Sequence, residues 1–384
     1  MKKPIQVTRP SLPPFEEYAE EIKKIWENYR LTNFGPLEEE LRAALEEFLG
    51  VENIVLFTNG HQALEAAIKL IAERREGEEN EIITTPFTFA STTHAIAGSG
   101  FRPVFADIDP VTYTLDPQKV EALIGPKTRA IVPVHVYGML CDTAAFENIS
   151  RKYNIPVIYD AAHAFGVRTA EGKGAGTAGA ASMFSFHATK AFNTVEGGAV
   201  AVKDKETAEK LRKFCNFGLG DGGDAEMTGT NAKMTEFAAA MGICNLRHIG
   251  EVIKKREQIC KTYTEILAGK DPGFDRATGI SGKYGIKLLP EQKGTFPNYA
   301  YYPVVFSGNI KAEEIAEKLA AENIFVRRYF FPLTSDFSCY KNLPHGETPV
   351  ADRISANVLA LPLYADMEEA DVRRVAKALL KIFK

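Results

Sequence analysis

Residues 155–166 read Ile-Pro-Val-Ile-Tyr-Asp-Ala-Ala-His-Ala-Phe-Gly, a short apolar run that ends in an acidic residue. Similar β-rich runs occur at 81–85, 103–107 and 130–135, and helical patterns or turns separate them. Strands that alternate with helices in this way are typical of an α/β fold built on a mostly parallel sheet. The sequence therefore predicts a doubly wound sheet in which residues 157–160 form one strand.

Two further apolar runs, at 183–186 and 199–202, follow each other without a long helix between them. Because parallel neighbours need a crossover connection, these two runs are expected to pair as an antiparallel hairpin. Closer to the N-terminus, residues 37–48 show an amphipathic helical pattern, and the strand-like run 54–57 leads through a polar turn into a second helical pattern. A mixed sheet flanked by helices is predicted.

The C-terminal part of the chain begins with a long helical pattern, over residues 235–267. Strand-like runs at 301–306 and 325–328 follow, and helical patterns at 350–358 and 368–383 close the chain. We therefore expect a large domain over residues 1–250 and a smaller α/β domain over residues 251–384.

The composition fits an ordinary globular protein and excludes several classes. Of the 384 residues, 45% are hydrophobic and 25% are charged, which argues against disorder and a long coiled coil. A formal net charge of -4 without a basic block disfavours nucleic-acid binding. The five cysteines form no Cys-x-x-Cys pair, so neither a disulfide framework nor a metal site is predicted. With neither a secretory signal nor a membrane span in the sequence, we expect a cytoplasmic protein.

Two charged residues follow predicted strands, where open α/β sheets place their ligand crevice. Asp160 ends one strand, and a carboxylate buried there needs a cation or a strong donor, although it is also a common helix N-cap. Lys190 follows the run 183–186 and precedes Gly197-Gly198. Desolvation at this place favours a nucleophilic amine, although a single lysine is more often solvated.

The turn Asn59-Gly60-His61 opens a predicted helix, so its free backbone N–H groups form a candidate phosphate site, or merely cap the helix. An aromatic turn with Phe87 and Phe89 precedes another helical pattern. A lysine, a strand-end carboxylate, an aromatic ring and a phosphate cradle are the four groups that pyridoxal 5'-phosphate needs. This cofactor is therefore predicted.

Several motifs carry a resemblance to a known family. They are Thr58-Asn59-Gly60, Thr85-Pro86-Phe87-Thr88-Phe89, Asp160-Ala161-Ala162-His163, Ser185-Phe186-His187-Ala188-Thr189-Lys190 with Glu196-Gly197-Gly198, Gly229-Thr230-Asn231-Ala232-Lys233-Met234-Thr235-Glu236 and Arg327-Arg328-Tyr329-Phe330-Phe331-Pro332. Together they resemble the DegT/DnrJ/EryC1/StrS family of sugar aminotransferases, in register over nearly the whole chain. The resemblance implies a fold-type-I pyridoxal-phosphate-dependent transferase that forms a homodimer with shared active sites.

The resemblance also implies roles for individual residues. Lys190 would bind the cofactor aldehyde and move the proton during transfer, while Asp160 would hold the pyridinium nitrogen. Phe89 would stack on the ring, with core packing expected for Phe87. His163 would lie beside the ring, although a structural histidine is an equal alternative. For the phosphate, the resemblance implies Ser185 and the backbone of Gly60 and His61, with Asn231 or Lys233 reaching it across the dimer interface; His61 stands where many relatives carry threonine.

On the substrate side the resemblance implies His187, Arg327, Arg328 and Tyr329, although a solvated basic strand end is the alternative for the arginines. The predicted reaction transfers an amino group from L-glutamate to a nucleotide-diphosphate keto sugar, a 4-keto-6-deoxyhexose first and a 3-keto sugar second. Two alternatives stay open: a non-catalytic regulatory protein that binds the cofactor, and a lyase or desulfurase that would need a catalytic cysteine such as Cys215 or Cys339. The glycine-rich segment 218–229 is expected to be a loop that serves as a lid.

Overall fold

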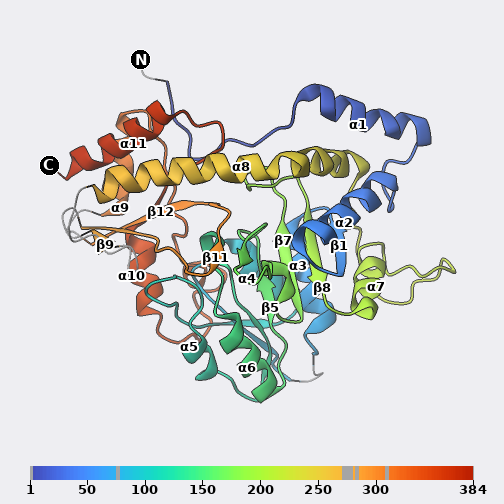
Figure 1. Ribbon diagram of the computed structural model, residues 1–384. Helices are drawn as coiled ribbons and strands as arrows, with labels where there is room; N and C mark the ends of the chain where they lie inside the picture. The colour runs from blue at the N-terminus through green and yellow to red at the C-terminus, as the bar shows by residue number, and fades with distance from the viewer. Residues whose placement is uncertain (1–2, 75–77, 270–279, 282–284, 308–310, 384) are drawn as a thin grey trace.

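The computed structural model describes residues 3–74, 78–269, 280–281, 285–307 and 311–383, and its centre is one mixed β-layer (Figure 1). The strands pair in the orders β1-β8-β7-β5 and β3-β2-β4, and isolated parallel bridges from Ile131 to Val157 and from Val134 to Asp160 join the two sheets. The strands of this layer are β1 (Asn53–Phe57), β2 (Glu81–Thr84), β3 (Arg102–Phe105), β4 (Thr128–Val132), β5 (Ile158–Asp160), β7 (Ala181–Ser185) and β8 (Gly198–Val202).

The strand directions confirm a mixed, mostly parallel sheet. Strand β2 is parallel to both β3 and β4, and β5 is parallel to β7. The expected hairpin is confirmed as well, because β8 runs antiparallel to both β7 and β1. Strands β5 and β7 therefore end side by side at the same edge, where a ligand crevice is expected.

Helices cover both faces of this layer. The N-terminal helices are α1 (Phe15–Asn28), α2 (Pro36–Leu49), α3 (Gly60–Ile71), α4 (Ala90–Gly98), α5 (Pro117–Glu121), α6 (Thr143–Tyr153) and α7 (Lys205–Phe214). Apolar residues of α3, α4 and α7 pack with one face of the sheet, and those of α2 and α8 (Glu236–Ala268) pack with the other. Helices α5 and α6 extend this second layer over β2, β4 and β5. The result is a three-layer α/β/α arrangement.

Helix α8 connects the layered part to the C-terminal part and runs across the whole molecule in Figure 1. Ala239 and Ile243 near its start pack in the core under the central sheet, whereas Tyr263 and Leu267 near its end pack in the C-terminal core. The predicted domain boundary at residue 250 falls inside this continuous helix, and it stays a prediction. Ile5 also packs in the C-terminal core, so the N-terminal segment crosses between the two parts.

The C-terminal part is a small antiparallel sheet in the order β13-β12-β10-β9 with three helices. Its elements are β9 (Ile280–Ser281), β10 (Ile286–Leu288), β12 (Tyr302–Phe306), α9 (Ala312–Ala321), α10 (Pro349–Asn357), β13 (Val358–Leu361) and α11 (Glu369–Ile382), and β11 (Thr295–Phe296) pairs with β6 (Arg168–Thr169) outside this sheet. Residues 325–328 form no strand, which corrects the sequence-based expectation. The Phe325 amide donates to Ile5, whereas Arg327 exchanges two hydrogen bonds with Ala360, so the segment pairs at single points and forms no ladder.

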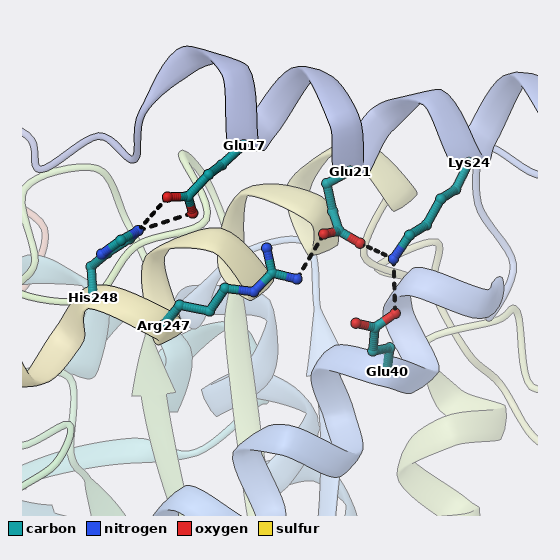
Figure 2. A network of polar contacts seen from close by, with 6 residues as sticks. All are labelled: Glu17, Glu21, Lys24, Glu40, Arg247 and His248. Atoms are coloured by element: carbon teal, nitrogen blue, oxygen red, sulfur yellow. Dashed lines mark hydrogen bonds and ion pairs between the residues drawn. The ribbon is translucent and has the colours of Figure 1, made fainter.

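Helix α1 lies on α8 and is held there by the ionic contacts in Figure 2. Both carboxylate oxygens of Glu17 lie within 3.1 Å of His248 Nε2, and Glu21 accepts a hydrogen bond from Arg247 at 2.8 Å. Lys24 contacts Glu21 and also Glu40 of α2. In the described part of the chain, no helix combines the length and apolarity that crossing a bilayer requires.

Candidate active site

The site lies where β5 and β7 end next to each other. Asp160 is the last residue of β5, and Ser185 is the last residue of β7, five positions before Lys190. Parallel pairing of these strands brings the two segments to the same edge of the sheet. The structure thus brings together the acidic and basic residues that the sequence placed at strand ends.

Asp160 is a buried carboxylate without a cation in direct contact. It is 4% exposed, and it accepts hydrogen bonds from Thr92 Oγ1 at 2.7 Å and from the Ala162 amide at 3.0 Å. Burial raises the pKa of Asp160, and these two hydrogen bonds together with the nearby Lys190 charge only partly oppose that rise. Among the described residues, no lysine, arginine or histidine lies within ion-pair distance of it. A cationic ligand atom would supply the missing partner.

Lys190 lines a small hollow together with His163 and Tyr301. Its Nζ donates a hydrogen bond to the Tyr301 hydroxyl at 3.4 Å, and it lies 5.9 Å from the centroid of that ring. The amine is therefore only partly buried and faces an open volume. A lysine in such a place can reach a ligand as well as its protein partner.

His163 is buried beside Lys190 and is neutral. Its Nδ1 accepts a hydrogen bond from the Tyr137 amide at 3.1 Å, so the ring carries its proton on Nε2. Burial, and secondly the Lys190 charge, lower the pKa of His163 well below its ordinary value. The ring stacks on Phe330 at a centroid distance of 5.8 Å. This geometry is compatible with a position beside the cofactor ring and with a purely structural role for His163.

The predicted phosphate turn lies directly against the end of β7. Asn59 caps α3 by accepting a hydrogen bond from the Gln62 amide at 2.9 Å, which leaves the first amides of the helix at the turn. A Cβ atom at Gly60 would come within 2.9 Å of Ser185 Cβ, so only glycine allows this close approach. His61 Nδ1 lies 3.0 Å from Ser91 Oγ of α4. Helix amides, a serine and a histidine therefore surround one small region.

The two phenylalanines of the aromatic turn differ in exposure. Phe87 is fully buried and packs edge-on against Tyr113 and Phe330, as expected for a core residue. Phe89 is 60% exposed at the N-cap position of α4, so its ring is free to contact a ligand. This difference favours Phe89 over Phe87 as the stacking residue.

The side chains of three candidate site residues, His187, Asn231 and Lys233, contact residues that are close to them in the sequence. His187 Nδ1 contacts Thr189 Oγ1 at 2.8 Å, and its Nε2 lies 3.6 Å from Glu196. Asn231 accepts a hydrogen bond from Lys233 at 2.6 Å. The glycine-rich segment that precedes Asn231 forms a loop that projects outward beyond α7 (Figure 1).

Tyr329, the last residue of the Arg327-Arg328-Tyr329 segment, lines a second hollow together with Thr8, Arg256 and Tyr301. Arg328 stacks on the Phe331 ring with its guanidinium carbon 3.3 Å from the centroid, and burial lowers its pKa. Arg327 is exposed, and its backbone pairs with Ala360. Of the three residues, only Tyr329 lines either hollow.

Sequence reasoning missed three residues that shape the site: Thr92, Tyr301 and Asn298. Thr92 was detectable, because it follows Phe89 by three positions in the first turn of α4 and so faces the same edge of the sheet. Tyr301 and Asn298 lie in a segment of the C-terminal part that comes back to Lys190 and His163. No local pattern marks their contact with the site.

The chemical groups that these residues offer match those that pyridoxal phosphate requires. Asp160 offers a buried negative charge without a cation, as a pyridinium nitrogen requires, and Lys190 offers a primary amine at the wall of a hollow. The start of α3 offers backbone amides beside Ser185, a suitable cradle for a phosphate.

Comparison with known proteins gives one consistent result. The model of the DegT/DnrJ/EryC1/StrS aminotransferase family matches residues 15–380. Two relatives carry the name dTDP-4-amino-4,6-dideoxy-D-glucose transaminase: one from Shigella dysenteriae is 40% identical, with both chains fully covered, and one from Escherichia coli is 38% identical over 98% of both chains. The structure of DesI in the presence of its TDP-sugar product superposes with a TM-score of 0.90 at 34% identity, covering 100% of this chain and 93% of that one.

The sequence-based assignments of family, fold class, enzyme class and cofactor are thereby confirmed. The fold is that of the pyridoxal-phosphate-dependent aminotransferases, with a mixed sheet between helices. The chain belongs to the DegT/DnrJ/EryC1/StrS aminotransferase family, and it is a pyridoxal-phosphate-dependent aminotransferase.

Proposed function

We propose that the protein transfers an amino group from L-glutamate to C4 of a 4-keto-6-deoxyhexose carried on a nucleotide diphosphate. The observation that carries this proposal is the 40% identity, over the full length of both chains, to a relative named for a 4-amino-4,6-dideoxy sugar. The E. coli relative at 38% identity has the same name, and the superposed DesI structure was obtained with a TDP-sugar product.

Each charged residue of the site has a part in this proposal. When bound, pyridoxal phosphate withdraws electrons from the carbon that carries the amino group. Asp160 would hold the ring nitrogen and keep it protonated. Lys190 would hold the cofactor through its amine and would serve as the base for the proton on Cα of the amino donor. His163 would lie beside the ring and offer its Nε2–H as a donor, because its Nδ1 already accepts the Tyr137 amide.

The phosphate is held by the first amides of α3 at Gly60 and His61 and by the Ser185 hydroxyl, which lie together in the structure. Phe89 covers the ring from its exposed position at α4. We further propose a homodimer in which Asn231 or Lys233 of the partner subunit reaches the same phosphate. The exposure of Asn231 supports this, because it leaves that side chain accessible to another chain.

The nucleotide sugar is proposed to bind along the two adjoining hollows. Tyr329 lines the second hollow, and Arg327 and Arg328 directly precede it in the chain, so we propose that they approach the diphosphate. His187 lies three residues before Lys190 and can contact the sugar close to the reacting carbon. Arginine and tyrosine donors suit a ligand that combines phosphate with hydroxyl groups.

The experiment is a substrate panel with the cofactor-loaded enzyme. L-Glutamate is combined with dTDP-4-keto-6-deoxy-D-glucose or with its 3-keto isomer, and 2-oxoglutarate and the mass of the aminated nucleotide sugar are measured. We expect turnover with the 4-keto sugar at least about tenfold above the 3-keto sugar. A preference for the 3-keto sugar would contradict amination at C4. A preference for another amino donor would contradict the assignment of L-glutamate. The absence of any amino transfer would instead support the regulatory alternative.

A matched variant locates the chemistry. Lys190→Ala is expected to lose turnover by at least about 1,000-fold, because no other amine lines the hollow among the described residues. Borohydride reduction of the loaded wild-type enzyme, followed by peptide mass mapping, should place the cofactor on Lys190. A label on another lysine would contradict the proposed site.

A further inference from the structure

Tyr301 lies at the junction of the two hollows and contacts the amine of Lys190. It lines both hollows, and its hydroxyl oxygen accepts the hydrogen bond from Lys190 Nζ at 3.4 Å. This distance is at the long end for a hydrogen bond, as is common for catalytic contacts in ligand-free enzymes. Tyr301 comes just before β12, so the C-terminal part of the chain supplies this contact.

The ring of Tyr301 is fixed by other aromatic rings. Its centroid lies 4.7 Å from that of His163, 5.9 Å from that of Tyr137 and 5.7 Å from that of Tyr329, and the Tyr329 ring stands nearly perpendicular to it. Such contacts restrict the rotation of a side chain. The hydroxyl is therefore held at one place relative to the strand-end residues.

The backbone before Tyr301 is anchored from two sides. Asn298, which is 2% exposed, donates through Nδ2 to the carbonyl oxygens of His163 and Phe165 at 2.8 and 2.9 Å. Arg256 of α8, which is 3% exposed, donates to the carbonyl oxygens of Tyr299 and Ala300 at 2.9 and 2.8 Å. Arg256 forms no ion pair in the described part of the chain. The hydrogen bonds of Asn298 attach the Tyr301 segment to the segment after β5, and those of Arg256 attach it to α8.

We propose that Tyr301 is a positioning residue for Lys190 in the aminotransferase reaction, with Asn298 and Arg256 as the anchors that fix it. A lysine that leaves the cofactor has a long flexible side chain, and it must return to one geometry to move the proton. The Tyr301 hydroxyl oxygen accepts one N–H of the amine, which restricts the directions left to the nitrogen lone pair. This inference rests on the proposed role of Lys190.

The test compares two tyrosines of the same segment. Tyr301→Phe keeps the ring and removes only the hydroxyl, and Tyr299→Phe is the matched control, because the Tyr299 hydroxyl contacts Glu257 at 3.3 Å. For Tyr301→Phe we expect kcat with L-glutamate to fall about 10- to 100-fold, with KM for both substrates within about twofold. Tyr299→Phe should match the wild type in both parameters.

Two further readouts separate positioning from a general structural effect. With glutamate deuterated at Cα, the isotope effect on kcat should be larger in Tyr301→Phe than in the wild type, because proton transfer becomes slower relative to the other steps. When pyridoxal phosphate is mixed with cofactor-free protein, the visible absorption band should develop several-fold more slowly in Tyr301→Phe, since Lys190 reaches the aldehyde less often. The melting temperature should not change.

The inference is overturned if Tyr301→Phe equals Tyr299→Phe in kcat, isotope effect and loading rate. It is also overturned if KM alone changes, since that result would assign the hydroxyl to substrate binding. Failure of the proposed function has a different signature: the wild type itself would show no reaction with glutamate, or would carry the borohydride label at another lysine.

Discussion

Glu21 on α1 and Asp160 at the end of β5 are both 4% exposed, although Asp160 lies deeper in the protein, and their pKa values move in opposite directions. Burial alone raises the pKa of Glu21, but the hydrogen bonds and charges of Lys24 and Arg247 outweigh it and lower the pKa (Figure 2). Burial likewise raises the pKa of Asp160, but there Thr92, the Ala162 amide and the more distant Lys190 do not reverse the rise.

The difference shows how the protein treats buried charge in two regions. Where α1 contacts α8, Lys24 and Arg247 compensate the charge of the Glu21 carboxylate, so no ligand is needed there to stabilise it. At the strand ends the protein's own groups compensate Asp160 only in part, and under the proposed function a cationic ligand atom would offset the remaining cost of burying its charge. An incompletely paired buried charge next to a hollow therefore marks the site more clearly than burial does.

The largest expected effect comes from neutralising Asp160. In Asp160→Asn the ring nitrogen loses its charged partner, so we expect kcat to fall about 100- to 1,000-fold in the glutamate half-reaction. The cofactor-free protein should at the same time keep or increase its melting temperature, because a costly buried charge is removed. Thr92→Val is the comparison variant, with a decrease of about tenfold expected, because it removes one hydrogen bond and leaves the charge.

Full activity of Asp160→Asn, or a melting temperature several degrees below the wild type, would contradict this account. The first result would mean that the carboxylate does not act on the cofactor. The second would mean that Asp160 stabilises the fold through its charge, as Glu21 does.

The strand-end positions of Asp160, Ser185 and Lys190 were predictable because topology determines them. Parallel strands end at one edge of the sheet, and the alternating pattern already predicts that edge. The hairpin of β7 and β8 was predictable too, because the short connection excludes a crossover.

Other features of the site depend on long-range packing. Tyr301 is 111 positions from Lys190, so no local pattern encodes that contact. Thr92 is 68 positions from Asp160, and only its place in the first turn of α4, three residues after Phe89, indicates that it faces the same edge of the sheet. The segment 325–328 has a strand-like composition, but its neighbours, the N-terminal segment and β13, offer pairing at single points only. Composition indicates which residues suit a strand, whereas the available partners decide whether a ladder forms.

Glu38 sharpens the comparison, because it is also buried and poorly compensated but lies on helix α2 and not at the end of a strand, as Asp160 does. It is 1% exposed, its Oε2 has no hydrogen-bond partner among the described residues, and burial together with the Glu39 charge raises its pKa to about 7. The folded state therefore binds this proton more tightly than the unfolded state, and the stability of the wild type falls as pH rises from about 4.5 to 7. Glu38→Gln should remove this loss.

At pH 8 we expect Glu38→Gln to be more stable than the wild type by about 2 kcal/mol, which should raise the melting temperature by several degrees. At pH 4.5 both proteins should melt at nearly the same temperature, because the carboxyl is then protonated in the wild type. Activity should not change. A stability difference that does not depend on pH would mean that packing of the amide, and not the buried charge, causes it.

The smallest expected effect concerns Glu21, at the contact between α1 and α8. Glu21→Gln removes the charge that Lys24 and Arg247 share, and it should cost about 1 kcal/mol, or roughly 2 °C in melting temperature, because both cations are half exposed. The lowered pKa of Glu21 means that its contribution is present at neutral pH and is lost as pH falls through that value, so the two proteins should converge in acid. Glu20→Gln is the matched control on the same helix: its pair with Lys23 is largely exposed, so its melting temperature should change by less than about 1 °C. Equal effects of the two substitutions would show that burial adds nothing to this contact, and the contrast with Asp160 would then lose its basis.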